Sequence, residues 1–156
     1  MTLLICAALA SEGSTEKEAG MRIFLAGGTA QSSGGSSQAA ELGFHLTRMG
    51  ERVGGEYGLS LSTYKVNNTT FPVFNFDGGL RWRPSPDWKV QPYLAGGVGV
   101  SFLLILPIPS LTLGLGAALE LGELTLDVTL RARQLVDIYG QTEGVSVGTL
   151  ELGVGF

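Results

Sequence analysis

The sequence contains few charged residues. Asp, Glu, Lys and Arg account for 15% of its 156 residues, whereas about 25% is typical of soluble domains. The net charge is −4 and no cluster of Lys and Arg occurs, which argues against a nucleic-acid-binding surface. There is one cysteine, Cys6, and one histidine, His45. The sequence therefore predicts no disulfide framework, no metal-binding residues and no cofactor.

Long apolar runs are missing as well. A membrane-spanning helix needs about 20 consecutive apolar residues, and the longest candidate, residues 98–108, is broken by Pro107. The short run at residues 3–10 ends in small residues, as a secretory signal peptide does before its cleavage site. A positive charge before this run is absent, so we expect residues 1–10 to be a signal peptide with a truncated start.

Cleavage after Ala10 would remove Cys6, and the bulky Ile5 argues against a lipoprotein signal at that cysteine. Residues 11–20 are polar and lack periodicity, which predicts a flexible periplasmic lead-in. The remaining residues, 21–156, are expected to form one domain.

Alternating polarity is the dominant pattern in that domain. In the last ten residues Leu150, Leu152, Val154 and Phe156 share one parity, and Glu151 has the other. This period of two is typical of a β-strand with one apolar face. Seven earlier segments repeat it, so the sequence contains eight strand-like runs: 21–29, 40–47, 53–62, 74–83, 90–102, 111–121, 124–133 and 147–156.

The charges of the eight runs all have the parity opposite to the apolar one. Five are cationic and six anionic: Arg22, Glu41, Glu56, Asp77, Arg81, Arg83, Glu120, Asp127, Arg131, Arg133 and Glu151. A soluble barrel would place the large apolar side chains inside, where eight strands leave too little room for them. We therefore predict an inside-out barrel, in which the apolar face contacts lipid and the opposite charges pair inside.

Connection lengths predict how this barrel lies in its membrane. Short turns are expected near Gly50, at 84–87 and near Gly122, and longer loops at 31–38, 65–72, 103–111 and 140–146. Short turns are periplasmic in such barrels and long loops extracellular, so both termini should be periplasmic. Trp82, Trp88 and Phe156 would then lie at the periplasmic membrane interface, where aromatic residues are common.

With its terminal Phe156, its eight alternating runs and its charged interior, the chain resembles the small eight-stranded outer-membrane β-barrels of the OmpA/OmpX type. The resemblance implies an all-β, eight-stranded antiparallel up-and-down transmembrane β-barrel with a polar, ion-paired interior, in the bacterial outer membrane. It also implies contact with the lipid bilayer and lipopolysaccharide, and recognition of the Phe156 strand by the barrel-assembly machinery. Val154 departs from the family pattern, because an aromatic residue often stands there.

Three functions are compatible with this prediction. The favoured one is a non-enzymatic barrel with a plugged lumen and a structural or surface-interaction role, without catalytic residues and with an unknown extracellular partner. A lipid-modifying enzyme is the first alternative, but His45 is expected near the periplasmic end, paired with Glu41 inside the barrel. The second is a binding barrel that uses the apolar loop 103–110 through Leu104, Leu106 and Ile108; extension of the flanking strands into lipid would equally explain that loop.

Overall fold

The computed structural model describes residues 18–66, 69–85, 87–103, 105–136 and 144–156. Within them it contains eight β-strands: β1 (Glu18–Ser32), β2 (Gly35–Met49), β3 (Val53–Val66), β4 (Thr69–Trp82), β5 (Val90–Leu103), β6 (Leu106–Leu121), β7 (Leu124–Leu135) and β8 (Ser146–Gly155). In the described residues no helix is long and apolar enough to cross a membrane.

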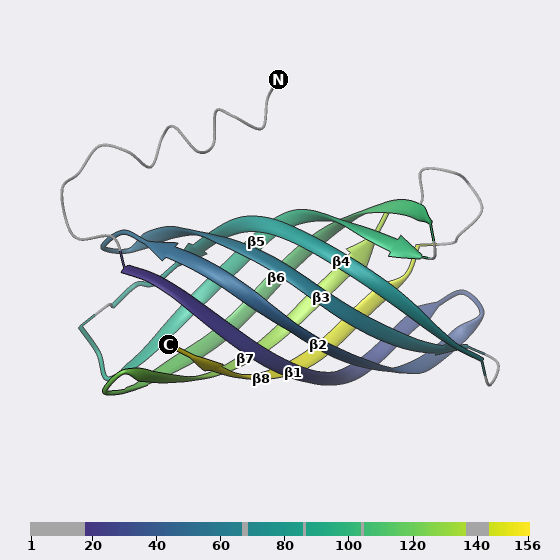
Figure 1. Cartoon of the computed structure of the whole chain (residues 1–156). Coiled ribbons are helices and arrows are strands. Elements are labelled where there is room, and N and C mark those ends of the chain that lie inside the picture. Colours follow the sequence, from purple (N-terminus) through teal and green to yellow (C-terminus); the bar gives the residue numbers. More distant parts are fainter. Residues whose placement is uncertain (1–17, 67–68, 86, 104, 137–143) are drawn as a thin grey trace, which may run out of the picture.

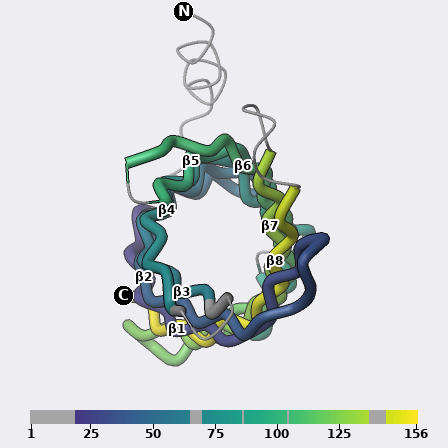
Figure 2. Tube along the Cα trace, turned by 90° about the vertical axis from the view of Figure 1, so that its right-hand side faces the viewer, coloured from purple at the N-terminus to yellow at the C-terminus, as the bar shows by residue number. Residues whose placement is uncertain are grey.

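The strands form one closed antiparallel barrel in sequence order, β1 to β8, with β8 paired back to β1. Figure 1 shows the strongly tilted strands from the side, and Figure 2 shows the ring that they form. Because the strand number is even, β1 starts and β8 ends at the same end of the barrel. We call this end the terminal end, and the opposite end, which carries the β1–β2, β3–β4 and β5–β6 hairpins, the far end.

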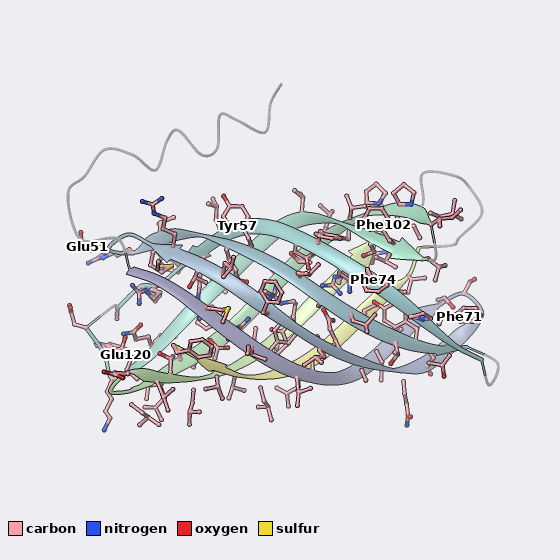
Figure 3. All side chains as sticks on the ribbon, viewed as in Figure 1. Glu51, Tyr57, Phe71, Phe74, Phe102 and Glu120 are labelled. Carbon is pink, nitrogen blue, oxygen red and sulfur yellow. The ribbon has the colours of Figure 1, made fainter. Side chains whose placement is uncertain are left out.

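Side-chain exposure alternates along each strand in the direction that the sequence predicts. Leu113, Leu126 and Leu152 are 66%, 43% and 58% exposed on the outside, whereas Arg131 and Glu151 are 6% and 0% exposed inside. Tyr57, Phe74 and Phe102 also point outward (Figure 3). The inside-out polarity is therefore confirmed, because a soluble barrel would have the reverse exposure.

The predicted loops at the far end are shorter than expected. β1 continues to Ser32 and β2 begins at Gly35, which has a φ of 121°, so most of the expected loop 31–38 is strand. The expected loops 65–72 and 103–111 are likewise mostly strand. Backbone pairing does not require an apolar face, so the ladder continues where the alternating pattern, which depends on contact with lipid, has ended.

Two connections at the terminal end agree with the sequence, whereas the expected turn 84–87 lies in a longer segment between Trp82 and Val90 that includes residue 86, outside the described residues. Short turns join Met49 to Val53 and Leu121 to Leu124, the latter through Gly122 with a φ of 71°. At the start of the chain, β1 begins at Glu18, so residues 18–20 of the expected lead-in belong to the barrel. The predicted signal peptide and residues 11–17 lie outside the described residues.

Candidate functional site: a charge ring in the lumen

Six buried charged side chains inside the lumen form a closed cycle in which positive and negative groups alternate. We call it the charge ring. Its ion pairs are Arg22–Asp127, Asp127–Arg81 (2.8 Å), Arg81–Glu56 (3.5 Å), Glu56–Arg131 (2.8 Å), Arg131–Glu151 (2.7 Å) and Glu151–Arg22 (3.3 Å). Three guanidinium groups meet three carboxylates, so the ring is electrically neutral, as burial of ions requires.

The ring joins walls of the barrel that are far apart in the sheet. Its members come from β1, β3, β4, β7 and β8. Long arginine side chains reach across the lumen because many inward positions are small. Gly153 is an example, since a Cβ there would lie 2.9 Å from the Cγ and Cδ atoms of Arg22.

Tyr93 on β5 packs against the charge ring and is hydrogen-bonded to it, although the pattern of charges in the sequence did not indicate this residue. Its aromatic ring lies under the Arg81 guanidinium at 3.4 Å, a cation–π contact. Its hydroxyl donates a hydrogen bond to Asp127 at 2.7 Å and accepts one from Arg22 at 2.9 Å. Thr129 adds a hydroxyl bonded to Asp127 at 2.7 Å. The sequence signal was an aromatic residue at an inward position otherwise occupied by small residues.

His45 lies beside the charge ring with different partners from those expected. The predicted partner was Glu41, but the nearest carboxylate is that of Glu56, 3.6 Å from Nδ1. Arg22 donates a hydrogen bond to the same nitrogen, and Phe24 packs against the imidazole with 4.7 Å between ring centroids. The reason is the register: Glu41 faces the next polar cluster along the barrel.

That second cluster, which we call the Arg133 bridge, consists of one cation between two carboxylates. Arg133 lies 3.2 Å from Glu41 and 2.7 Å from Asp77. Ser60 donates a hydrogen bond to Glu41. Among the described residues, the buried Oδ1 of Asp77 has no hydrogen-bond partner. Because one guanidinium lies between two carboxylates, the Arg133 bridge has one negative charge in excess.

Beyond the Arg133 bridge the described buried residues are uncharged. Asn75 donates to Ser60 (3.1 Å) and Ser62 (2.7 Å) and accepts from Ser101 (2.7 Å). Nearer the far end follows an apolar layer of five buried residues: Ala30, Ala39, Tyr64, Val73 and Val147.

Two of the predicted interior charges lie apart from both clusters. Arg83 donates to Gln91 at 2.8 Å, and Gln91 donates to Glu120 at 2.6 Å. Glu120 is exposed at the terminal end (Figure 3). These two residues therefore lie at the mouth of the barrel, near solvent, and are joined through Gln91 rather than through the ion pairs of the lumen.

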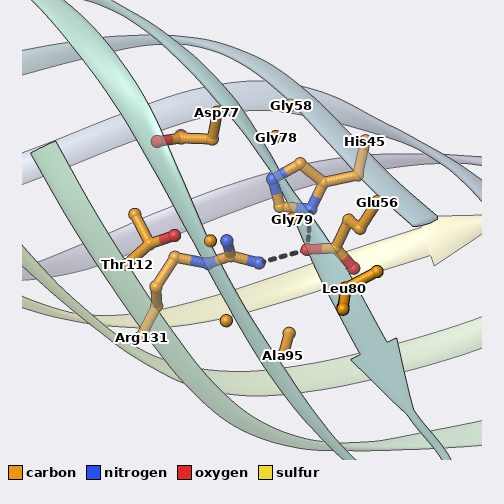
Figure 4. A pocket seen from close by; sticks show the side chains of 12 residues that line it. His45, Glu56, Gly58, Asp77, Gly78, Gly79, Leu80, Ala95, Thr112 and Arg131 are labelled. Carbon is orange, nitrogen blue, oxygen red and sulfur yellow. Dashed lines mark hydrogen bonds and ion pairs between the residues drawn. The ribbon is translucent and has the colours of Figure 1, made fainter. Parts of the chain in front are cut away.

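The lumen between the two charged clusters contains a cavity of about 10 Å³. Figure 4 shows His45, Glu56, Asp77 and Arg131 around it. A space of this size holds about one water molecule. No group of three or more potential metal ligands is found in the described part of the chain.

The remaining residues singled out from the sequence lie on the outside or at the ends. Trp82, Trp88 and Phe156 are exposed at the terminal end, at 44%, 61% and 59%. Leu106 is 51% exposed, but Ile108 is buried and points inward; Leu104 lies outside the described residues. The segment 103–110 is therefore a strand hairpin, and Ile108 is not available to a partner.

The fold resembles known outer-membrane barrels. Neisserial surface protein A superposes with a TM-score of 0.73 at 16% identity, covering 90% of this chain and 98% of that one. The outer membrane enzyme PagL superposes with a TM-score of 0.66 at 13% identity, covering 85% of this chain and 97% of that one. Ail, the attachment invasion locus protein of Yersinia pestis, superposes with a TM-score of 0.58 at 18% identity, covering 90% of this chain and 98% of that one. No protein-family model and no curated protein sequence matches the chain.

These likenesses concern the fold, because the identities are low. They agree with the closed barrel topology of this chain. The chain thus has the fold of the small eight-stranded outer-membrane β-barrels, with an apolar exterior and a charged lumen.

Proposed function

We propose that the protein is a non-conducting, non-enzymatic barrel with a structural or surface-interaction role in the outer membrane. The charge ring is the observation that carries this proposal. Its six groups bridge opposite walls, and eight strands enclose only enough space for side chains. Water and ions would have to break several buried ion pairs to pass, and each break leaves an uncompensated buried charge.

Planar-bilayer recording of the purified, refolded protein tests the closed lumen. We expect a membrane containing the protein to stay at the conductance of the protein-free membrane. Stable openings on the order of a nanosiemens, typical of water-filled barrels, would contradict the proposal. Insertion is checked on the same sample by protection of the strands from added protease.

The orientation that we propose has the terminal end in the periplasm and the far end at the cell surface. Even-stranded bacterial barrels with both termini on one side are arranged in this way. A Ser33→Cys variant in the β1–β2 hairpin should react with a membrane-impermeant maleimide on intact cells. A Glu123→Cys variant in the β6–β7 turn should react only after lysis, and the unsubstituted protein gives the background. The reverse labelling would contradict this orientation.

A lipid-modifying enzyme is the second candidate, because PagL, described as an outer membrane enzyme, has a similar fold. The burial of His45 argues against it. The sequence has one histidine, and that side chain is 2% exposed and hydrogen-bonded inside the lumen. A serine hydrolase mechanism that uses histidine as base would need this group beside the lipid. Mass spectra of lipid A from expressing cells should be unchanged; loss of an acyl chain would favour the enzyme.

The β5–β6 hairpin supports a binding role more narrowly than the sequence suggested. Ile105 is 88% exposed and Leu106 is 51% exposed at its tip, and exposed apolar groups often mark contact surfaces. A variant with Ile105→Ser and Leu106→Ser should fold and insert normally if the tip serves contact. Failure to insert would instead assign these residues to lipid.

A further inference from the structure

The outer surface of β6, β7, β8 and β1 changes character near the far end. These strands are neighbours in the sheet (Figure 1). In the middle of the barrel the paired outward residues of β6, β7 and β8 are large and apolar, as in the row Leu115, Leu130 and Leu150, and Gly27 of β1 pairs with Leu150. Two rows closer to the far end, the paired residues are Leu111, Gln134, Ser146 and Gln31. The apolar surface that faces lipid therefore ends in a neutral polar row on β7, β8 and β1.

Between these rows lies a hollow in the outer surface. Its floor is the intermediate row, where Ala132 pairs with Gly148 and Gly148 pairs with Thr29. The hollow has a volume of about 460 Å³, which is in the range of small-molecule sites. Leu111 and Leu113 of β6 form one wall, and their exposures of 52% and 66% show that the hollow opens to the outside rather than to the lumen.

The polar row forms the rim of the hollow. The Ser146 hydroxyl donates a hydrogen bond to the side-chain oxygen Oε1 of Gln134, and the side-chain Nε2 of Gln134 donates to the backbone carbonyl of Leu135 at 3.2 Å. The side chain of Gln31 is exposed. These side chains offer amide and hydroxyl groups, both donors and acceptors, at the edge of the apolar surface.

We propose that this hollow binds one acyl chain of lipid A, the acylated glucosamine lipid of the outer leaflet. The chain would lie over Ala132 and Gly148 and continue along the lipid-facing surface toward Leu130 and Leu150. Its amide or ester linkage would meet Gln134, Ser146 and Gln31. The hollow is continuous with the surface that lipid already covers, so an acyl chain enters it without leaving the membrane.

Charge favours an acyl linkage over a phosphate as the group that is recognised. Among the described residues that line the hollow, only Arg133 is charged, and its side chain points into the lumen and pairs with Glu41 and Asp77. The choice of lipid A over a phospholipid rests on the orientation proposed above, which places the far end in the outer leaflet.

Substitutions that fill the hollow test the proposal. A Cβ at Gly148 would have no heavy atom within 4 Å, so Gly148→Leu places its added side chain in the open space of the hollow. Gly78→Leu is the matched control, because Gly78 also faces outward, on β4, where a Cβ would make an ordinary contact of 3.6 Å with Tyr57. Ala132→Leu fills the same hollow from β7 and covers the case that the first variant does not fold.

Binding is measured by native mass spectrometry of the refolded full-length protein in detergent, titrated with lipid A or with phosphatidylglycerol. The unsubstituted protein and Gly78→Leu should retain one lipid A molecule, and a filled hollow should weaken retention about tenfold or more. Equal retention by all variants would overturn the site. Equal retention of phosphatidylglycerol, or labelling of Ser33→Cys only after lysis, would overturn lipid A as the occupant. Bilayer conductance reports on the lumen and is independent of these results.

Discussion

The charge ring contains equal numbers of positive and negative groups, and each of them contacts two groups of opposite charge. The Arg133 bridge instead has a single cation for two carboxylates. This difference decides how a single residue contributes to stability. Loss of one charge from the charge ring leaves an excess of buried positive or negative charge. Loss of one carboxylate from the Arg133 bridge leaves a balanced pair instead.

We therefore expect Asp127→Asn to destabilise the barrel and Asp77→Asn to have little effect. Removal of one partner of a buried ion pair costs about 3–5 kcal/mol, and Asp127 contacts both Arg22 and Arg81. Asp77→Asn keeps an oxygen for Arg133 and removes the charge with the unpartnered Oδ1, so we expect a change below about 1 kcal/mol.

Urea unfolding in lipid vesicles, followed by tryptophan fluorescence, measures both variants under the same conditions. The comparison is matched because both substitutions exchange Asp for Asn inside the barrel. Equal destabilisation by the two substitutions would contradict the division of the lumen into a neutral ring and a negatively charged bridge.

At the scale of the strand, depth in the membrane determines which outward substitutions are tolerated. Leu130 lies in the middle of β7, and Leu124 is its first residue at the terminal end; both face outward, at 60% and 50% exposure. An arginine costs about 2–4 kcal/mol at the membrane midplane and about 0–1 kcal/mol near the interface.

Leu130→Arg should therefore lower the free energy of unfolding in vesicles by about 2–4 kcal/mol, and Leu124→Arg by no more than about 1 kcal/mol. The two strand positions share parity and residue type, so their difference reports depth. Equal effects of the two substitutions would show that β7 does not cross the hydrocarbon region in the way the fold implies.

The β6–β7 turn depends on a single backbone conformation. Gly122 has a φ of 71°, in the left-handed region that costs a residue with a Cβ about 1–2 kcal/mol. We expect Gly122→Ala to destabilise the barrel by about that amount and Gly122→Asn by less, since Asn adopts this region more readily. Thermal or urea midpoints of the two variants provide the measurement. An equal loss would mean that the turn tolerates a different φ.

For the whole molecule, closure of the sheet makes unfolding cooperative and removes unpaired strand edges. All eight strand pairs are present, including β1 with β8. We expect the detergent-refolded chain to migrate faster in SDS gels before boiling than after it. An open sheet would lack this resistance, so identical mobility of the boiled and unboiled samples would contradict the closed barrel. Removal of residues 147–156, which form most of β8, should abolish the difference.

The amino-acid sequence by itself determined the polarity and approximate positions of all eight strands. Alternation is a local property, because successive side chains of a strand point to opposite faces. The parity of Arg131 and Leu130, for example, follows from their positions in the sequence alone. Strand ends at the far end were not predictable, because residues such as Ser32 and Gly35 continue the backbone ladder where neither face needs to be apolar.

Only the tertiary structure decided which interior charges meet. Arg22 and Glu151 are 129 residues apart in the sequence, and their contact follows from the register with which β8 closes onto β1. Register likewise brought His45 to Glu56 instead of Glu41, brought Tyr93 to Arg81, and aligned Ala132 with Gly148 under the polar row. The face on which a side chain lies follows from its position along the covalent chain. Which side chains meet across the lumen depends on how the eight strands are displaced along one another when the sheet closes.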